Sequence, residues 1–128
     1  LHVPGRLFSV NNRTTRMVPD LFARNERVVS IFDTECGPMA LIMVGAIFVG
    51  SMETVWAGTV TPTSSRHKVT TLHYGEDGAI QLERGQEMGR FNMGSTVILL
   101  FPDQKIEWKE ILRSDDPVIM GQTLGNIT

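Results

Sequence analysis

Short apolar and β-branched runs, each ended by glycine, proline or a small polar residue, recur along the whole sequence and constrain its fold most. Runs this short between turn signals are typical of β-strands, and helical periodicity is weak. The predicted strands are residues 28–32, 39–44, 46–49, 53–56, 69–74, 79–82, 96–101 and 118–120, with 106–111 either a strand or a helical turn. We therefore expect a mainly β sandwich or barrel with one or two short helical turns, at residues 19–24.

One short repeat refines this expectation. Gly-Gln-Glu-Met-Gly at residues 85–89 recurs as Gly-Gln-Thr-Leu-Gly at residues 121–125, which is 36 residues later. Two glycines around one apolar residue allow a tight turn between short strands. Turns of this kind resemble those of barrel-sandwich hybrid domains, the family of biotinyl and lipoyl carriers and of sugar-permease phosphocarrier domains. The repeat thus predicts a barrel-sandwich-hybrid-like fold with a duplicated hybrid motif, and it says nothing of function.

Charge and cysteine content exclude several classes of function. The formal net charge is −2, from 12 basic and 14 acidic residues that are interspersed, so we expect no nucleic-acid partner. The single cysteine, Cys36, rules out an internal disulfide. Residues 36–52 carry no charge, but glycine and proline break this stretch, so two buried strands are a better interpretation than a membrane span.

Few residues have the spacing that catalytic or metal sites require. His2, His67 and His73 do not pair with another ligand at a metal-binding spacing, so we predict no metal site. Ser95 lacks the flanking glycines of a hydrolase elbow, and no phosphate-binding loop is present. What remains is Met-Gly-Ser-Thr at residues 93–96, which taken alone is a common turn before a strand.

The surrounding residues change that interpretation. Val-Pro-Gly-Arg-Leu-Phe-Ser-Val-Asn at residues 3–11 resembles a segment of bacterial phosphatidylserine decarboxylases, and Arg-Gly-Gln-Glu-Met-Gly-Arg-Phe at 84–91 resembles the block before their cleavage motif. Further blocks that resemble the family lie at residues 21–28, 32–35, 37–40, 44–46, 49–51 and 53–58. The family motif is Leu-Gly-Ser-Thr, and methionine at position 93 keeps the volume and apolar character of leucine.

The resemblance implies a self-made cofactor. The Ser95 hydroxyl would be the self-cleavage nucleophile and attack the Gly94 carbonyl, and an N-to-O acyl shift would give an ester. Elimination would leave dehydroalanine at position 95, and hydration with loss of ammonia would give a pyruvoyl group. Residues 1–94 would then end the β chain and residues 95–128 would form the α chain, both within the C-terminal part of one catalytic domain.

The same resemblance implies the reaction and the partners. The pyruvoyl group would form a Schiff base with phosphatidylserine and act as an electron sink while carbon dioxide leaves, giving phosphatidylethanolamine. The family carries a His-x-x-His segment, an acidic residue and amphipathic membrane helices upstream of the block at residues 3–11. We therefore expect a domain that lacks its upstream part, exposes apolar surface and stays uncut when expressed alone. The complete protein is expected to be a peripheral enzyme on the cytoplasmic face of the bacterial inner membrane, and a homodimer.

Two alternatives stay open. The chain could be a non-catalytic hybrid-motif domain that kept the fold and lost the chemistry. It could also be a pyruvoyl decarboxylase for a soluble amino acid, although the long matching blocks favour the lipid substrate.

Overall fold

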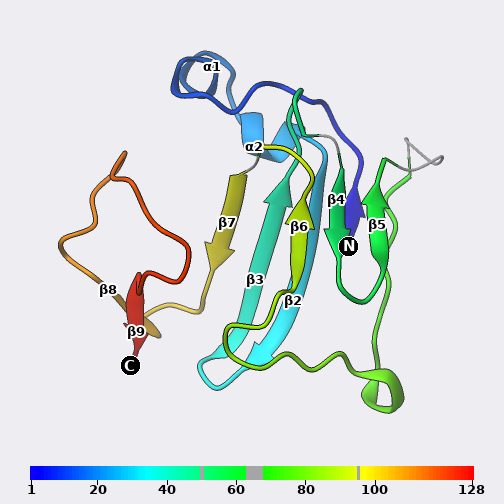
Figure 1. Ribbon diagram of the computed structural model, residues 1–128, viewed down its shortest axis with the longest axis vertical. Helices are drawn as coiled ribbons and strands as arrows, with labels where there is room; N and C mark the ends of the chain where they lie inside the picture. Colours follow the sequence, from blue (N-terminus) through cyan, green and yellow to red (C-terminus); the bar gives the residue numbers. More distant parts are fainter. Residues whose placement is uncertain (50, 63–67, 95) are drawn as a thin grey trace.

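The computed structural model describes residues 1–49, 51–62, 68–94 and 96–128. Ser95 and His67, both singled out in the sequence, lie outside the described residues. The fold is mainly β, as predicted, and its named strand pairs are all antiparallel (Figure 1).

The strands form three groups. The main sheet has the order β1-β2-β3-β7, with β1 at His2–Val3, β2 at Arg27–Thr34, β3 at Gly37–Val44 and β7 at Thr96–Leu100. The small sheet has the order β5-β4-β6, with β5 at Gly58–Thr61, β4 at Met52–Thr54 and β6 at Gly89–Phe91. The C-terminal strand pair joins β8 at Ile106–Trp108 to β9 at Gly125–Ile127.

Three short helical segments complete the part of the fold that the structure describes. They are α1 at Asn12–Met17, α2 at Leu21–Arg24 and the 3-10 turn η1 at Glu76–Gly78. The helix predicted at residues 19–24 is confirmed as α2, whereas α1 was not predicted from the sequence. Asn11 caps α1 by accepting a hydrogen bond from the Thr14 N–H at 2.9 Å. Both helices lie at the end of the main sheet where β3 finishes and β7 begins (Figure 1).

The core lies between the main sheet and the small sheet. Val28, Met43 and Met52 form the buried cluster, and Phe91 and Val60 of the small sheet pack against it. In Figure 1, β6 of the small sheet accordingly overlaps β2 and β3 of the main sheet.

The opposite face of the main sheet exposes apolar side chains. Ile31 and Leu100 are both paired with Ala40 across the sheet, so they share this face, and they are 70% and 56% exposed. The apolar exposure expected from the sequence is therefore present.

Several predicted strands are wrong. Residues 46–49 form a turn in which the Val49 N–H donates to the Ala46 carbonyl, and residues 79–82 and 118–120 form no strand. Residues 69–74 make only one isolated bridge, between Thr70 and His2. The strands at 28–32 and 39–44 are confirmed, as are residues 96–100 of the next one, and 106–111 begins with the three residues of β8. The strand predicted at 53–56 ends at Thr54. An apolar run becomes a strand only where a partner strand satisfies its backbone groups.

The sequence repeat is also a structural repeat. Gln86 Oε1 accepts a hydrogen bond from the Glu83 N–H at 2.6 Å, and Gln122 Oε1 accepts one from the Ile119 N–H at 3.0 Å. Each first glycine has a left-handed backbone, with φ of 82° at Gly85 and 84° at Gly121. The second glycine of each copy begins a strand, β6 or β9.

Candidate functional site

Gly94 lies where the chain crosses from one sheet to the other. Residue 91 ends β6 in the small sheet and residue 96 begins β7 in the main sheet. The predicted cleavage bond, Gly94–Ser95, thus belongs to a short connection between two anchored strands. The geometry of Ser95 itself lies outside the described residues.

Gly94 has an unusual backbone conformation and open surroundings. Its φ is 58°, in the left-handed region that other residues rarely adopt. A Cβ atom built at this position meets no described atom within 4 Å, and Gly94 is exposed. The space into which a side chain at position 94 would project is therefore open.

The chain before Gly94 is fixed to β4 by Asn92. The Asn92 N–H donates to the Ser51 carbonyl at 3.1 Å, which continues the pairing of β6 with β4. Its side-chain amide donates to Ser51 Oγ and, at 3.1 Å, to Glu53 Oε1. A hydrogen bond thus links the Glu53 carboxylate to the segment that precedes the predicted cleavage bond.

The chain after Gly94 is fixed to β3. Thr96 pairs with Val44 and the pairing continues to Leu100 opposite Ala40. Val44 is fully buried, so its backbone offers a rigid template for β7. The first residue after Ser95 is therefore already held in the main sheet.

A buried asparagine joins three of the matching sequence blocks beside this site. Asn25 is 0% exposed, and its side-chain amide donates to the Phe8 carbonyl at 2.8 Å and to the Gly45 carbonyl at 2.9 Å. Its side-chain oxygen accepts from the Phe8 N–H at 2.9 Å. Gly45 directly follows Val44, the partner of Thr96, so Asn25 holds the strand end against which β7 begins.

Sequence reasoning did not identify Asn25, Asn92, Ser51 or Glu53 as parts of this site. Asn25 and Glu53 lie inside matching blocks, and Asn92 directly precedes the predicted cleavage motif. Their position within those blocks, or next to the motif in the case of Asn92, was the signal that could have drawn attention to them.

His2 does not lie at this site. His2 is buried on β1, where Nε2 is 2.8 Å from Glu26 Oε1. Because β1 is three strands from β7, His2 is about 14 Å from the start of β7 at ordinary strand spacing. His73 is exposed and belongs to no strand. His2 is therefore not placed to act as a base at Gly94.

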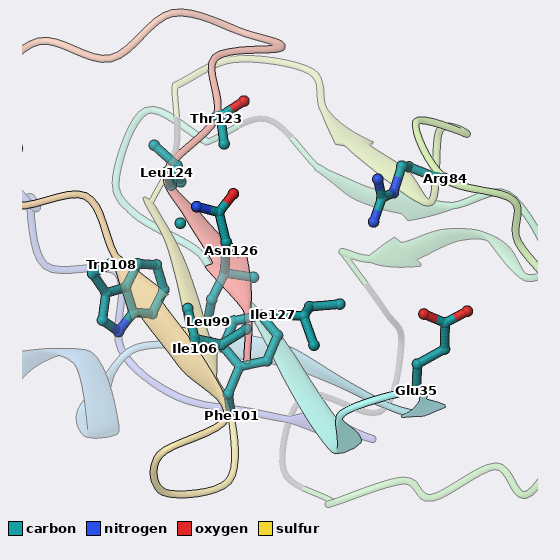
Figure 2. A pocket seen from close by; sticks show the side chains of 11 residues that line it. Glu35, Arg84, Leu99, Phe101, Ile106, Trp108, Thr123, Leu124, Asn126 and Ile127 are labelled. Atoms are coloured by element: carbon teal, nitrogen blue, oxygen red, sulfur yellow. The ribbon is translucent and has the colours of Figure 1, made fainter.

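A cavity of about 680 Å³ lies at the other end of β7. Figure 2 shows Trp108 and Phe101 on one side of it and the charged groups of Glu35 and Arg84 on the other. Leu99, which also lines it, is three residues beyond Thr96, or about 10 Å along the strand. This cavity therefore does not enclose the predicted cleavage bond.

Other site classes are not represented in the described ranges. No group of three or more His, Cys, Asp or Glu side chains there could hold a metal ion. None of the helices in this part of the chain is long and apolar enough to cross a membrane.

Comparison with known proteins gives a consistent result. The family model described as phosphatidylserine decarboxylase matches residues 1–126. The phosphatidylserine decarboxylase proenzyme of Nitrosococcus oceani is 58% identical over 126 residues, which cover 98% of this chain and 41% of that protein. The proenzymes of Ectopseudomonas mendocina and Bordetella avium are 56% and 58% identical, and the matched residues cover 44% and 42% of those proteins. The chain thus spans less than half the length of these relatives.

Proposed function

Because the chain belongs to the phosphatidylserine decarboxylase family, we propose that it is the self-cleaving part of an enzyme that converts phosphatidylserine to phosphatidylethanolamine. The relatives are named proenzymes, a term for a precursor that becomes active after processing. The observation that carries the proposal is the Gly94 backbone, left-handed and unobstructed between two anchored strands. The Gly94–Ser95 bond is the proposed cleavage site.

The proposed cut needs no external oxidant or reductant. The Ser95 hydroxyl gives its proton to a base and its oxygen bonds to the Gly94 carbonyl carbon. The carbon–nitrogen bond breaks and an ester forms. Loss of the α-proton of residue 95 then expels Gly94 as a carboxylate and leaves dehydroalanine. Addition of water and loss of ammonia convert that residue to a pyruvoyl group.

The described residues fit a cofactor at this position. No described atom lies within 4 Å of the position that a Cβ of residue 94 would take, and the pairing of Thr96 with Val44 would keep a new chain end in place after the cut. The pyruvoyl group supplies a ketone that withdraws electrons when carbon dioxide leaves the substrate. Asn92 and Asn25 act as positioning residues, since they hold the two ends of the crossing segment.

The proposal assigns residues 1–94 to the β chain and residues 95–128 to the α chain. All three C-terminal strands, β7, β8 and β9, then belong to the α chain. The pairing of β7 with β3 supports continued association of the two chains, because five consecutive residue pairs join them. Both chains belong to one catalytic domain whose remaining part lies elsewhere in the full-length protein.

The repeated Gly-Gln turn supports a finer assignment of the fold. Each copy precedes a short strand that pairs with an earlier three-residue strand, β4 in one case and β8 in the other. We assign the two units to a duplicated hybrid motif of the barrel-sandwich type. The full-length protein is further proposed to work at a lipid surface, on the cytoplasmic face of the bacterial inner membrane, and as a homodimer.

One pair of substitutions in the full-length protein tests the proposed cofactor. Ser95→Ala should leave a single uncut chain that releases no carbon dioxide from phosphatidylserine in detergent micelles. Ser114→Ala is the matched control, because Ser114 is an exposed loop residue of the same proposed α chain, and it should behave as the unmodified protein. Carbon dioxide release by Ser95→Ala would show that the cofactor is not made from Ser95.

A second candidate is a non-catalytic member of the same family. The observation that favours it is the position of His2, which contacts Glu26 and lies on β1, three strands from β7. An uncut full-length protein that binds phosphatidylserine would support this candidate.

A further inference from the structure

Two units of the molecule have the same local structure. In the first, β4 pairs with β6, and in the second, β8 pairs with β9. Both pairings extend one residue beyond the strands, through a hydrogen bond from the Val55 N–H to the Met88 carbonyl at 3.0 Å and from the Lys109 N–H to the Leu124 carbonyl at 2.9 Å. The two units can therefore be compared residue by residue.

In the first unit, both edges of the central strand are occupied. Antiparallel pairing directs the backbone groups of alternate residues to opposite edges. Since Val55 bonds toward β6, the backbone N–H and C=O groups of Met52 and Thr54 point to the other edge. That edge is covered by β5.

In the second unit, the equivalent edge has no partner strand among the described residues. Since Lys109 bonds toward Leu124, the backbone groups of Ile106 and Trp108 point away from β9. The sheet there contains β8 and β9 only.

The length of the connection between the two paired strands explains why the second unit has no equivalent of β5. Between β4 and β6 the chain has 34 residues, 55–88, and they include β5. Between β8 and β9 it has 16 residues, 109–124, without a strand of their own. The second unit therefore cannot supply its own equivalent of β5, and a bare strand edge favours pairing with another segment.

We propose that the outer edge of β8 receives a strand from the part of the full-length protein that lies outside residues 1–128. This chain covers only 41–44% of the relatives quoted above, so a segment of sufficient length belongs to the complete protein. A strand as short as β5, four residues, covers this edge. The added strand would also cover Trp108, which is 51% exposed and packs edge-to-face on Phe101.

A second copy of the chain fits this edge less well. The edge spans three residues, and a strand pair of that length between two copies buries far less than the roughly 1,200 Å² typical of a stable interface. A tethered segment of the same protein does not need so large an area, because it is already held close by.

Hydrogen exchange on full-length Ser95→Ala protein tests this proposal independently of self-cleavage, because the chain stays intact whether or not Ser95 makes a cofactor. The amides of Ile106 and Trp108 should exchange about 100-fold more slowly than the amide of fully exposed Met120. The Glu107 amide, which faces β9, serves as the internal standard for a protected position.

Two results would overturn the proposal. One is exchange at Ile106 and Trp108 as fast as at Met120 while Glu107 stays protected. The other is protection that disappears on dilution, because it would assign the partner strand to a second copy. Protection that is independent of concentration supports a segment of the same chain.

Discussion

The β4–β6 pair and the β8–β9 pair share one turn and one register, yet they differ in how much the protein core buries them. The first is built into the core, because Met52 on β4 packs between the two sheets and is 1% exposed. The second consists of two three-residue strands whose apolar side chains, such as Trp108 and Ile127, are about half exposed. An isolated two-stranded unit of this kind is at best marginally stable in water.

The difference separates two roles within one polypeptide. The segment around Gly94 connects β6 and β7, two strands that are paired with strands of the core. Its conformation therefore does not depend on the C-terminal strand pair. The strand pair, in contrast, needs a partner to be stable. A reactive bond is best placed on the rigid part, because a fixed geometry lowers the entropic cost of reaching the transition state.

The largest effect should come from the buried asparagine of the rigid part. Asn25→Ala leaves the Phe8 N–H and the Phe8 and Gly45 carbonyls without their buried partner, and should lower the free energy of unfolding by about 4 kcal/mol. Asn126→Ala, at an exposed position on β9, should change it by less than about 0.5 kcal/mol. Urea unfolding of full-length Ser95→Ala protein measures both. Equal effects would contradict the contrast between the two regions.

A smaller effect should distinguish the two repeated glycines. A Cβ atom at Gly89 would overlap the Glu53 carbonyl, and one at Gly125 would overlap the Glu107 carbonyl. Gly89→Ala should lower the free energy of unfolding by about 3 kcal/mol, since β4 is fixed in the core. Gly125→Ala should lower it by about 1 kcal/mol, since β8 is a three-residue strand outside that core. The same urea titration tests the pair. A larger loss for Gly125→Ala would mean that β8 is the more rigid strand.

The smallest effect on the free energy of unfolding should come from the glutamines of the repeated turn, and it should be equal in the β4–β6 and β8–β9 units. Gln86→Ala and Gln122→Ala each remove one exposed hydrogen bond from the repeated turn, so each should cost about 1 kcal/mol or less. Site-resolved hydrogen exchange at the bonded amides, Glu83 and Ile119, measures the local loss. Faster exchange at one amide but not at the other would show that the two turns are not equivalent.

How far the sequence predicts the fold depends on where each strand finds its partner. The strands at residues 28–32 and 39–44 were predicted correctly because a two-residue turn joins them and their pairing is local. Residues 118–120 have a similar apolar composition but no strand to pair with, and β9 forms instead at Gly125–Ile127, where the repeated turn directs the chain alongside β8. Local composition cannot reveal a partner that lies far away in the sequence.

Of the candidate site, the sequence predicted the proposed cleavage residues but not the contacts around them. The Met-Gly-Ser-Thr motif identified Gly94 and Ser95 only through the neighbouring blocks. The convergence of Phe8, Asn25 and Gly45 beside the start of β7 depends on contacts between distant segments, and no local pattern in the sequence indicates it.

The intact mass of the unmodified full-length protein tests the central claim most directly. We expect two polypeptides that separate between Gly94 and Ser95, the C-terminal one lighter by one ammonia than simple hydrolysis would leave it and resistant to N-terminal sequencing. One uncut chain from a folded, complete protein would contradict the account, and so would two chains separated at any other bond.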